Sequence, residues 1–449
     1  MSPELSRRTL LGGAAAAAVL SALPLSVRQA LAAPARPGRL EDIQHVVIFM
    51  QENRAFDHYF GTLPGVRGFG DRAAVRGVNG RSVFHQPDPS RAEGYLLPYP
   101  MNAAHTSAYQ QGAPAFGYVD SMNAWNDGRA DGSVTRRSSG WLGQGYYESA
   151  DMPFYHALAS VFTTCDAYYA SVQCNTNTNR EHLMTGTSGG TVRDTPVTDN
   201  SEPAAGFEWT TYAERLEQAG VSWQTYQALD NFDDNALAWF TSFHNAEPGS
   251  ALYERGLRQV GDPAKKGDPF AMGDALVDAF AADVQADKLP QVSWLIAPAA
   301  LSEHANYAPP NGEHLTARLL AALAAKPEVW AKTVFILNYD EHGGFFDTSC
   351  RPSRHWPPGA ARPPSPWTAR WWCGCPRAAR PTTGWSGRTA GTASGTRTAA
   401  WVGPPRCPPG RPWWPGRSRW AWACGCRWWW SRRGPAAAWS TPRCTTTPR

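Results

Sequence analysis

Two clusters of oxygen-bearing side chains follow apolar runs that lie far apart in the sequence. Residues 51–54 (Gln-Glu-Asn-Arg) follow the apolar run 43–50, and residues 339–342 (Tyr-Asp-Glu-His) follow the run 333–338. Either cluster alone is better explained by a helix cap or a solvated turn. Carboxylate and amide oxygens are, however, the ligands that hard divalent cations prefer. Taken together, the clusters predict a metal site made by Glu52, Asn53, Asp340 and Glu341.

A third segment with chemical potential is the Asn- and Thr-rich loop 171–180, which precedes a helix expected to begin at Glu181. A hydroxyl near a helix N-terminus and beside a cation can lose its proton and attack phosphorus. Asn179 and Arg180 would then hold the phosphoryl oxygens. The alternative is an ordinary polar helix cap.

Two isolated histidines, His105 and His304, complete the set of candidate reactive groups. An imidazole can protonate a leaving group or donate a hydrogen bond to a phosphate. Either histidine taken alone is more often a surface or structural residue.

The elements that must position these groups are predicted from the apolar runs. Residues 43–50 and 333–338 are compact, uninterrupted apolar stretches, which is typical of buried parallel strands. In open α/β sheets the ligand crevice lies outside the carboxyl ends of the strands, so both clusters would face one site. Residues 40–347 run on without an obvious break after a Pro- and Arg-rich linker at 33–39, and we expect them to form one catalytic domain.

The last part of the chain has a different composition. Of the 449 residues, 348–449 contain 17 Arg, 14 of the 21 Trp and 7 of the 9 Cys, but no Asp, Glu, Lys, Leu, Ile or Phe. An Arg-rich nucleic-acid-binding tail is one interpretation, although such tails are poor in aromatic residues. A metal or disulfide module at Cys373-Gly-Cys375 and Cys424-Gly-Cys426 is another, but the spacing is not that of zinc knuckles.

A reading-frame error accounts for this stretch better. Tryptophan has one codon, so the run Trp428-Trp429-Trp430 read one base earlier contains consecutive valines, which suit a buried strand. We therefore expect a truncated α/β domain followed by an unstructured, non-native tail. Without residues 1–32 and the tail, 22 basic residues face 37 acidic ones, and the formal charge changes from +4 to about −15. This balance argues against a nucleic-acid partner.

The N-terminus has the features of an export signal. Arg7-Arg8 precede a weakly apolar Ala-rich run, and Ala30-Leu31-Ala32 is a small-residue cleavage site. This pattern predicts a twin-arginine signal peptide over residues 1–32, recognition by the twin-arginine translocon, and a secreted or periplasmic location. An ordinary secretory signal and a membrane anchor are the alternatives. Cys165 and Cys174 can pair after export or remain free thiols.

Several motifs, in order, resemble the bacterial phosphoesterase family of secreted phospholipases C and acid phosphatases, within the alkaline phosphatase superfamily. They are Gln51 to Gly61, Trp125 to Gly128, Thr176 to Arg180, Ser302 to His304 and Asp340 to Gly344. Residues 221–240 are similar to the phosphocholine-specific branch. The resemblance implies a three-layer α/β/α, alkaline-phosphatase-like fold with a mostly parallel sheet. It also bears on the tail, because the frame-corrected reading restores a strand, a Ser-Pro-x-Ser-Arg-Gly-Gly segment and an Asp-His-Thr-Ser segment that the family has.

The resemblance also implies roles for the candidate residues. Glu52, Asn53, Asp340 and Glu341 match metal-binding positions, His105 and His304 match active-site histidines, and the substrate-binding candidates are Asn126, Asn179 and Arg180. Thr176 matches the nucleophile, although Asn175 and Thr178 replace prolines of the family loop and leave Thr178 as an alternative.

The implied activity is that of a phosphoric diester hydrolase that cleaves phosphatidylcholine at a membrane surface. A broad acid phosphatase or sulfatase, and a secreted binding protein without activity, are the alternatives. The cofactor would be a divalent ion, with calcium, magnesium, manganese and zinc all open, as is the oligomeric state.

Overall fold

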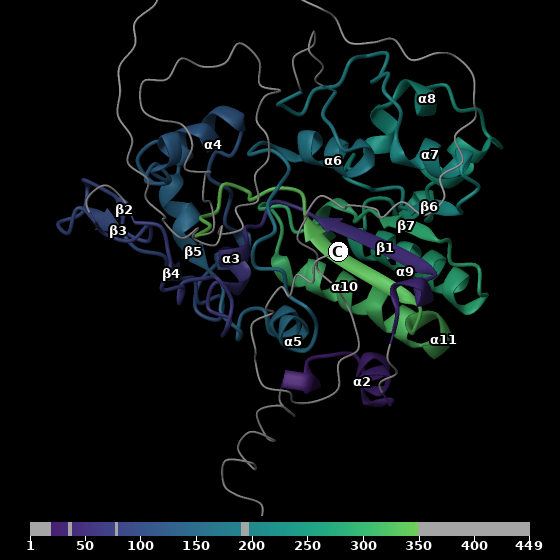
Figure 1. Ribbon diagram of the computed structural model, residues 1–449, viewed down its shortest axis with the longest axis horizontal. Helices are drawn as coiled ribbons and strands as arrows, with labels where there is room; N and C mark the ends of the chain where they lie inside the picture. The colour runs from purple at the N-terminus through teal and green to yellow at the C-terminus, as the bar shows by residue number, and fades with distance from the viewer. Residues whose placement is uncertain (1–18, 35–37, 77–79, 190–196, 349–449) are drawn as a thin grey trace, which may run out of the picture.

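The computed structural model describes residues 19–34, 38–76, 80–189 and 197–348 (Figure 1). Its centre is a four-stranded sheet with the order β6-β7-β1-β8, and every neighbouring pair is parallel. The strands are β1 (His45–Gln51), β6 (Trp223–Tyr226), β7 (Val292–Leu295) and β8 (Thr333–Tyr339). The expected α/β class with a parallel sheet is confirmed.

The two strands predicted from apolar runs are neighbours at one side of this sheet. β1 and β8 pair along their whole length, from His45 opposite Thr333 to Gln51 opposite Tyr339. Both strands are buried along most of their length because helices cover the two faces, which explains their continuous apolar sequence.

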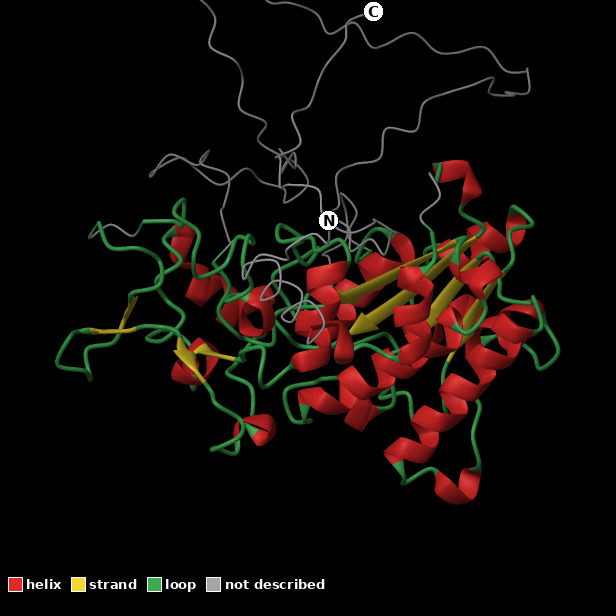
Figure 2. Ribbon diagram, turned by 90° about the horizontal axis from the view of Figure 1, so that it is seen from below, coloured by secondary structure: helices red, strands yellow, loops and turns green. Residues whose placement is uncertain are grey.

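Helices pack on both faces and complete a three-layer arrangement (Figures 1 and 2). Val47 and Phe49 of β1 point into the larger core, with α5 (Pro153–Val161), α9 (Pro269–Gln285) and α10 (Pro309–Ala324). Trp223 of β6 and Trp294 of β7 lie in the second core, with Met184 of α6 (Thr176–Thr185) and Ala213 of α7 (Tyr212–Gln218). The alternation of strand side chains thus separates two cores.

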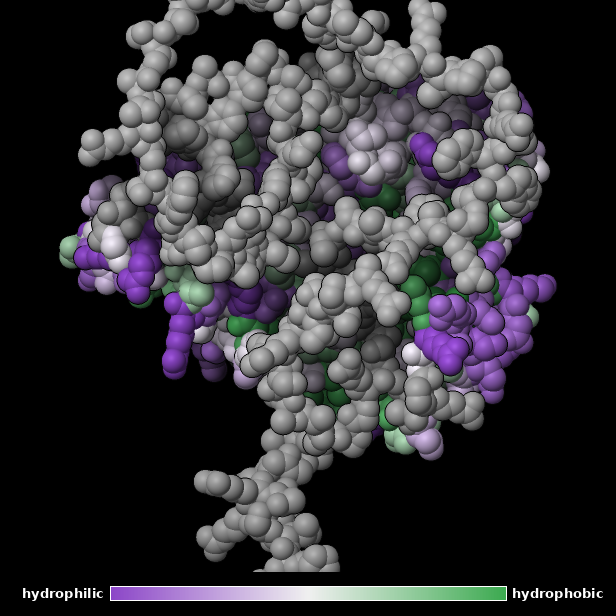
Figure 3. Space-filling model, viewed as in Figure 1, coloured by the Kyte–Doolittle hydropathy of each residue, from purple (hydrophilic) through white to green (hydrophobic). Residues whose placement is uncertain are grey.

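Smaller elements surround this centre. The helices are α3 (Phe56–Phe60), α4 (Tyr118–Trp125), α8 (Thr241–His244) and α11 (Pro327–Trp330). Two short pairs of strands lie apart from the main sheet: β2 (Gln86–Pro87) with β3 (Tyr95–Leu96), and β4 (Tyr99–Pro100) with β5 (Gly145–Tyr146). The space-filling view shows hydrophilic side chains gathered on the side where α9 and α11 lie (Figure 3). None of the helices in the described residues combines the length and the apolar character that crossing a bilayer requires.

Part of the predicted signal segment is folded against the domain. α2 (Leu25–Ala32) packs on α10, its Val27 side chain is fully buried, and Ser26 Oγ donates to the Ala321 carbonyl at 3.1 Å. The paired arginines lie outside the described residues, as do residues 349–449, so the predicted frame change and unstructured tail have no structural description.

Candidate active site

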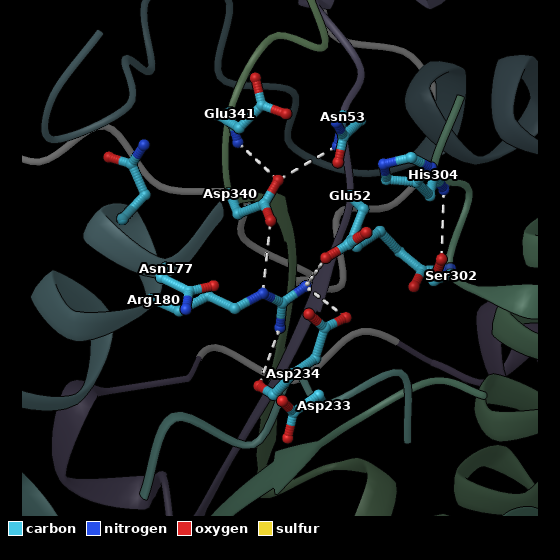
Figure 4. Close-up of polar contacts among 12 residues, drawn as sticks. Glu52, Asn53, Asn177, Arg180, Asp233, Asp234, Ser302, His304, Asp340 and Glu341 are labelled. Atoms are coloured by element: carbon cyan, nitrogen blue, oxygen red, sulfur yellow. Dashed lines mark hydrogen bonds and ion pairs between the residues drawn. The ribbon is translucent and has the colours of Figure 1, made fainter. Parts of the chain in front are cut away.

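The carboxyl ends of all four strands deliver polar side chains to one region (Figure 4). Glu52 follows β1, Asp340 follows β8, the segment with Asp234 follows β6, and His304 lies beyond β7. The segments that follow β1 and β7 are also hydrogen-bonded to each other, since the Glu52 amide donates to the Ser302 carbonyl at 3.0 Å. The predicted meeting of the two sequence clusters is therefore realised: the Asn53 amide donates to Asp340 Oδ1 at 3.1 Å.

Arg180 lies at the centre of this region. Its Nη2 is 3.2 Å from Glu52 Oε1 and 3.2 Å from Asp234 Oδ2, and its Nε is 3.3 Å from Asp340 Oδ2. The Arg180 side chain is 2% exposed and its three partners are at most 6% exposed. The sequence predicted that Arg180 holds phosphoryl oxygens, but in this structure its guanidinium is committed to carboxylates.

Burial determines the protonation of the carboxyl groups. Loss of hydration raises the pKa values of Glu52 and Asp340, and raises that of Asp234 to about 6, while the Arg180 charge acts in the opposite direction for all three. Burial likewise raises the pKa of Glu341, and the neighbouring Asp340 carboxylate adds to this rise. Burial thus penalises the ionised carboxylates more than the Arg180 charge stabilises them. A cation that entered the site would therefore stabilise their ionised forms.

The four predicted metal ligands fit a hard cation. Within the described residues, three of their buried oxygens have no hydrogen-bond partner: Glu52 Oε2, Asn53 Oδ1 and Glu341 Oε1. The other oxygens of Glu52 and Glu341 are held by Arg180 and by the Gly343 amide, respectively, which fixes the two carboxylates. No cluster of three His, Cys, Asp or Glu side chains in the described part of the chain has the arrangement of a metal site. A cation there would therefore rely on the Asn53 amide oxygen as well as on carboxylates.

The helix that carries the predicted nucleophile starts earlier than expected. α6 begins at Thr176 rather than at Glu181, because Asn175 is the extended residue before the first turn. Thr176 and Arg180 are four residues apart, so they lie on the same face of α6, which is the face toward the carboxylates. Thr178 lies on another face, is fully buried, and donates its hydroxyl to the Val197 carbonyl at 3.2 Å. This geometry favours Thr176 over Thr178.

Two of the predicted substrate-binding residues serve local structure. The Asn179 side chain closes the loop before α6, since it accepts from the Val172 amide at 2.9 Å and donates to the Val172 carbonyl at 3.1 Å. Asn126 ends α4 in the left-handed conformation and donates to Asp131 at 2.5 Å.

The two candidate histidines lie in different surroundings. His105 is on an exposed turn, and its backbone amide donates to the Asn102 carbonyl at 3.0 Å. His304 lies beside the carboxylates (Figure 4) and its ring contacts Phe232 at 5.3 Å and Phe116 at 6.5 Å between centroids. Burial, assisted by the Arg54 charge, lowers the pKa of His304 to about 4, so the imidazole is neutral at pH 7.

Sequence reasoning missed Asp234 and His342 as site residues. Asp234 is the third partner of Arg180, and the adjacent acids Asp233-Asp234 in the segment after β6 were the available signal. His342 Nδ1 accepts from the Gly344 amide at 2.9 Å, and its Nε2 is 3.2 Å from Ser121 Oγ. Burial lowers the pKa of His342 to about 3, so its 3.3 Å contact with Glu341 is not an ion pair.

Left-handed backbone occurs beyond every strand of the sheet. Asn53 beyond β1, Asp233 beyond β6 and Glu303 beyond β7 have φ values of 52°, 63° and 70°, and Gly343 beyond β8 has φ 59°. A Cβ atom on Gly343 would come within 2.1 Å of the Asn53 carbonyl oxygen, so only glycine fits there. Non-glycine residues in this conformation cluster at functional sites.

Cys165 and Cys174 are not joined to each other by a disulfide bond in the described part of the chain. Cys174 is buried, and its Sγ is 2.8 Å from the Thr198 carbonyl.

Comparison with known proteins identifies the family. Residues 43–375 match the Phosphoesterase family, a match that extends beyond Asp347. A non-hemolytic phospholipase C of Pseudomonas aeruginosa is 42% identical over 362 residues, covering 78% of this chain and 49% of the relative. A non-hemolytic phospholipase C of Burkholderia pseudomallei is 42% identical over 360 residues (75% and 49%), and phospholipase C B of Mycobacterium tuberculosis is 34% identical over 378 residues (79% and 69%). The chain thus spans about half the length of the first two relatives. It belongs to the Phosphoesterase family.

Proposed function

We propose that the complete protein is a phospholipase C that hydrolyses phosphatidylcholine to diacylglycerol and phosphocholine. Its relatives are named phospholipases C, and the described part of the chain holds buried acids, a hydroxyl at a helix start and a neutral imidazole at one sheet edge. The observation that carries the proposal is the position of Thr176, one helical turn before the Arg180 side chain that contacts Glu52 and Asp340.

The chemistry requires a nucleophile, a positive charge near the phosphoryl oxygens and a proton for the leaving group. Thr176 Oγ1 releases its proton to solvent and attacks phosphorus; the bond from phosphorus to the diacylglycerol oxygen breaks, and the phosphocholine group becomes bonded to Oγ1. Glu52, Asn53, Asp340 and Glu341 would hold a divalent ion, which would supply Lewis-acid stabilisation of the phosphoryl charge. Water then cleaves the phosphothreonine bond and releases phosphocholine.

His304 is the residue that gives a proton to the departing oxygen. Its pKa of about 4 reflects the site without a phosphodiester, and an anionic substrate beside the ring raises it. The imidazole therefore takes up its proton when substrate binds. Of the two candidate histidines, His304 lies in the site drawn in Figure 4, whereas His105 is on an exposed turn.

We assign selectivity for the lipid headgroup to the aromatic side chains around His304. Phe232 is 5.3 Å from the His304 ring and 5.9 Å from the Tyr307 ring, and Asp233 adjoins it in sequence. Aromatic faces with a nearby carboxylate attract a quaternary ammonium. Tyr226, another aromatic residue of the segment 221–240, is a core residue whose hydroxyl donates to Asp283 at 2.7 Å.

We further propose that residues 348–449 arise from a shift of reading frame and that this form is poorly active. The family has a further strand and an Asp-His segment in this part, which the shifted reading removes. DNA sequencing beyond the Asp347 codon tests the shift, and an uninterrupted frame in independent isolates contradicts it. Export by the twin-arginine route before cleavage at Ala32 belongs to the same proposal.

The activity is tested with the chain as it stands and with a frame-restored chain. Each is incubated with phosphatidylcholine vesicles and a divalent metal, and phosphocholine and inorganic phosphate are measured separately. Phosphocholine release that Thr176→Ala abolishes and matched Thr178→Ala retains supports the proposal. Release of phosphate alone indicates the phosphatase alternative, and no turnover by the restored chain indicates a binding protein.

A further inference from the structure

A buried carboxylate beneath the active site is not part of the proposed chemistry. Glu303 is fully buried, and both of its carboxylate oxygens accept hydrogen bonds. Oε1 accepts from Gln51 Nε2 at 3.0 Å and from the Tyr155 hydroxyl, and Oε2 accepts from the Tyr339 hydroxyl at 3.1 Å. The side chain is therefore saturated with neutral donors and is not directed to substrate.

Two of the residues that donate to the Glu303 carboxylate lie at the ends of strands β1 and β8. Gln51 and Tyr339 are opposite each other in the β1–β8 register, and the next residues along the two strands are Glu52 and Asp340. One carboxylate thus ties together the last residues of both strands that deliver the proposed metal ligands. The side-chain amide Nε2 of Gln51 also donates to the Leu301 carbonyl at 3.1 Å, which connects the segment beyond β7 to the same hydrogen-bond network.

The backbone of Glu303 fixes the segment that carries His304, which is the third component of the site. Glu303 has a φ of 70°, and its carbonyl accepts from Arg54 Nε at 2.7 Å. Arg54 Nη2 is also 3.2 Å from the Tyr307 carbonyl, so the segment that carries His304 is held on both sides. The space for the Glu303 side chain depends on Gly312, where a Cβ would come within 2.1 Å of Glu303 Cγ.

We infer that Glu303 is a positioning residue: it sets the distance between the carboxylate site and the imidazole of His304. The inference rests on the proposed function for the roles of Glu52, Asp340 and His304. Its physical basis is that a fully satisfied buried polar network allows one arrangement of the groups that it joins. Ligand-supporting residues of this kind change metal affinity or activity by about ten- to hundred-fold when they are replaced.

The test compares Glu303→Gln with Glu313→Gln in the full chain. Glu313 is a matched control, because it is a buried glutamate that accepts from the Tyr155 amide at 2.7 Å and makes no hydrogen bond to β1 or β8 in the described residues. We expect Glu303→Gln to weaken binding of calcium or manganese about ten-fold or more by calorimetry, and Glu313→Gln to leave it within two-fold. In the frame-restored chain, Glu303→Gln should lower kcat more than it raises KM, and excess metal should restore part of the loss.

Amide hydrogen exchange gives a readout that does not depend on activity. Glu303→Gln should accelerate exchange at the Glu52 and Asp340 amides, which donate to the Ser302 and Gln51 carbonyls, and the milder Tyr339→Phe should do so if Glu303→Gln does not fold. If the frame-restored chain binds no metal and cleaves no lipid, the proposed function fails while exchange still tests Glu303. If Glu303→Gln lowers only the melting temperature and leaves exchange at these amides and metal affinity unchanged, Glu303 is merely structural and the inference is overturned.

Discussion

Arg180 and Glu52 form a fully buried ion pair, with Nη2 and Oε1 3.2 Å apart, between residues that are distant in the sequence. The same guanidinium contacts Asp234 and Asp340, so one cation compensates three carboxylates. Its charge occupies the space between groups that would otherwise repel one another. This arrangement makes the metal-free site dependent on Arg180.

Replacement of Arg180 by Gln should therefore destabilise the metal-free protein by about 3–5 kcal/mol, because buried carboxylates lose their partner. The carboxylates would hold protons in the folded state that they lose on unfolding, so the loss should shrink as the pH falls below neutrality. Chemical unfolding at several pH values measures it. The control is Arg318→Gln, which breaks a partly exposed pair with Asp274 and should cost at most about 1 kcal/mol; equal losses in the two variants contradict the assignment.

Glu313 should make the free energy of unfolding fall as the pH rises, whereas the carboxylate of an ordinary ion pair makes it rise. Burial raises its pKa to about 8, from the usual 4.5. The folded state thus binds a proton more tightly than the unfolded state, and stability declines as the pH rises from about 4.5 to 8. Glu313→Gln should be more stable than the wild type at pH 9, by on the order of 1–3 kcal/mol, and should lose this advantage at pH 4. Parallel stability curves for the two proteins would refute this role for burial.

The proposed acid can be distinguished from the other histidine by substitution. His304→Gln should lower kcat of the frame-restored chain by roughly a hundred-fold or more, as loss of a general acid does. His105→Gln should have an effect at least ten-fold smaller, because His105 is on an exposed turn. Steady-state turnover of phosphatidylcholine measures both variants, and a larger effect at His105 would reverse the assignment.

The first turn of α4 and the residues just before it are expected to contact the lipid surface. Val119 is 69% exposed, while Phe116 packs on His304, and a Cβ on Gly117 would come within 3.8 Å of Asn175 Oδ1. Val119→Asp should weaken vesicle binding and vesicle hydrolysis about three-fold or more and should spare a monomeric, water-soluble phosphodiester. Leu40→Asp is the matched control, since Leu40 is 68% exposed and lies before β1, at the opposite edge of the sheet. Equal binding by both variants in a sedimentation assay would exclude this surface.

The sequence was sufficient for the sheet and for part of the site. Continuous apolar runs predicted β1 and β8, and the polar residues after them met as expected, because parallel strands end at one edge. The start of α6 was misplaced since Thr176 to Asn179 have low helix propensity, and tertiary contacts such as that of Thr178 with the Val197 carbonyl override it. Asp234 and Glu303 were missed because their roles depend on long-range partners, which local sequence patterns do not specify.

The left-handed residues beyond the strand ends have a consequence for evolution and engineering. Asn53, Asp233 and Glu303 each hold a backbone conformation that costs on the order of 1 kcal/mol or more relative to glycine, and the rest of the domain must compensate. Selection for thermal tolerance alone would relax these positions first. Variants that resist heat better but respond less well to metal are therefore expected to carry changes here. At this edge of the sheet, changes at the same few residues would therefore affect thermal stability and the chemistry of the site in opposite directions.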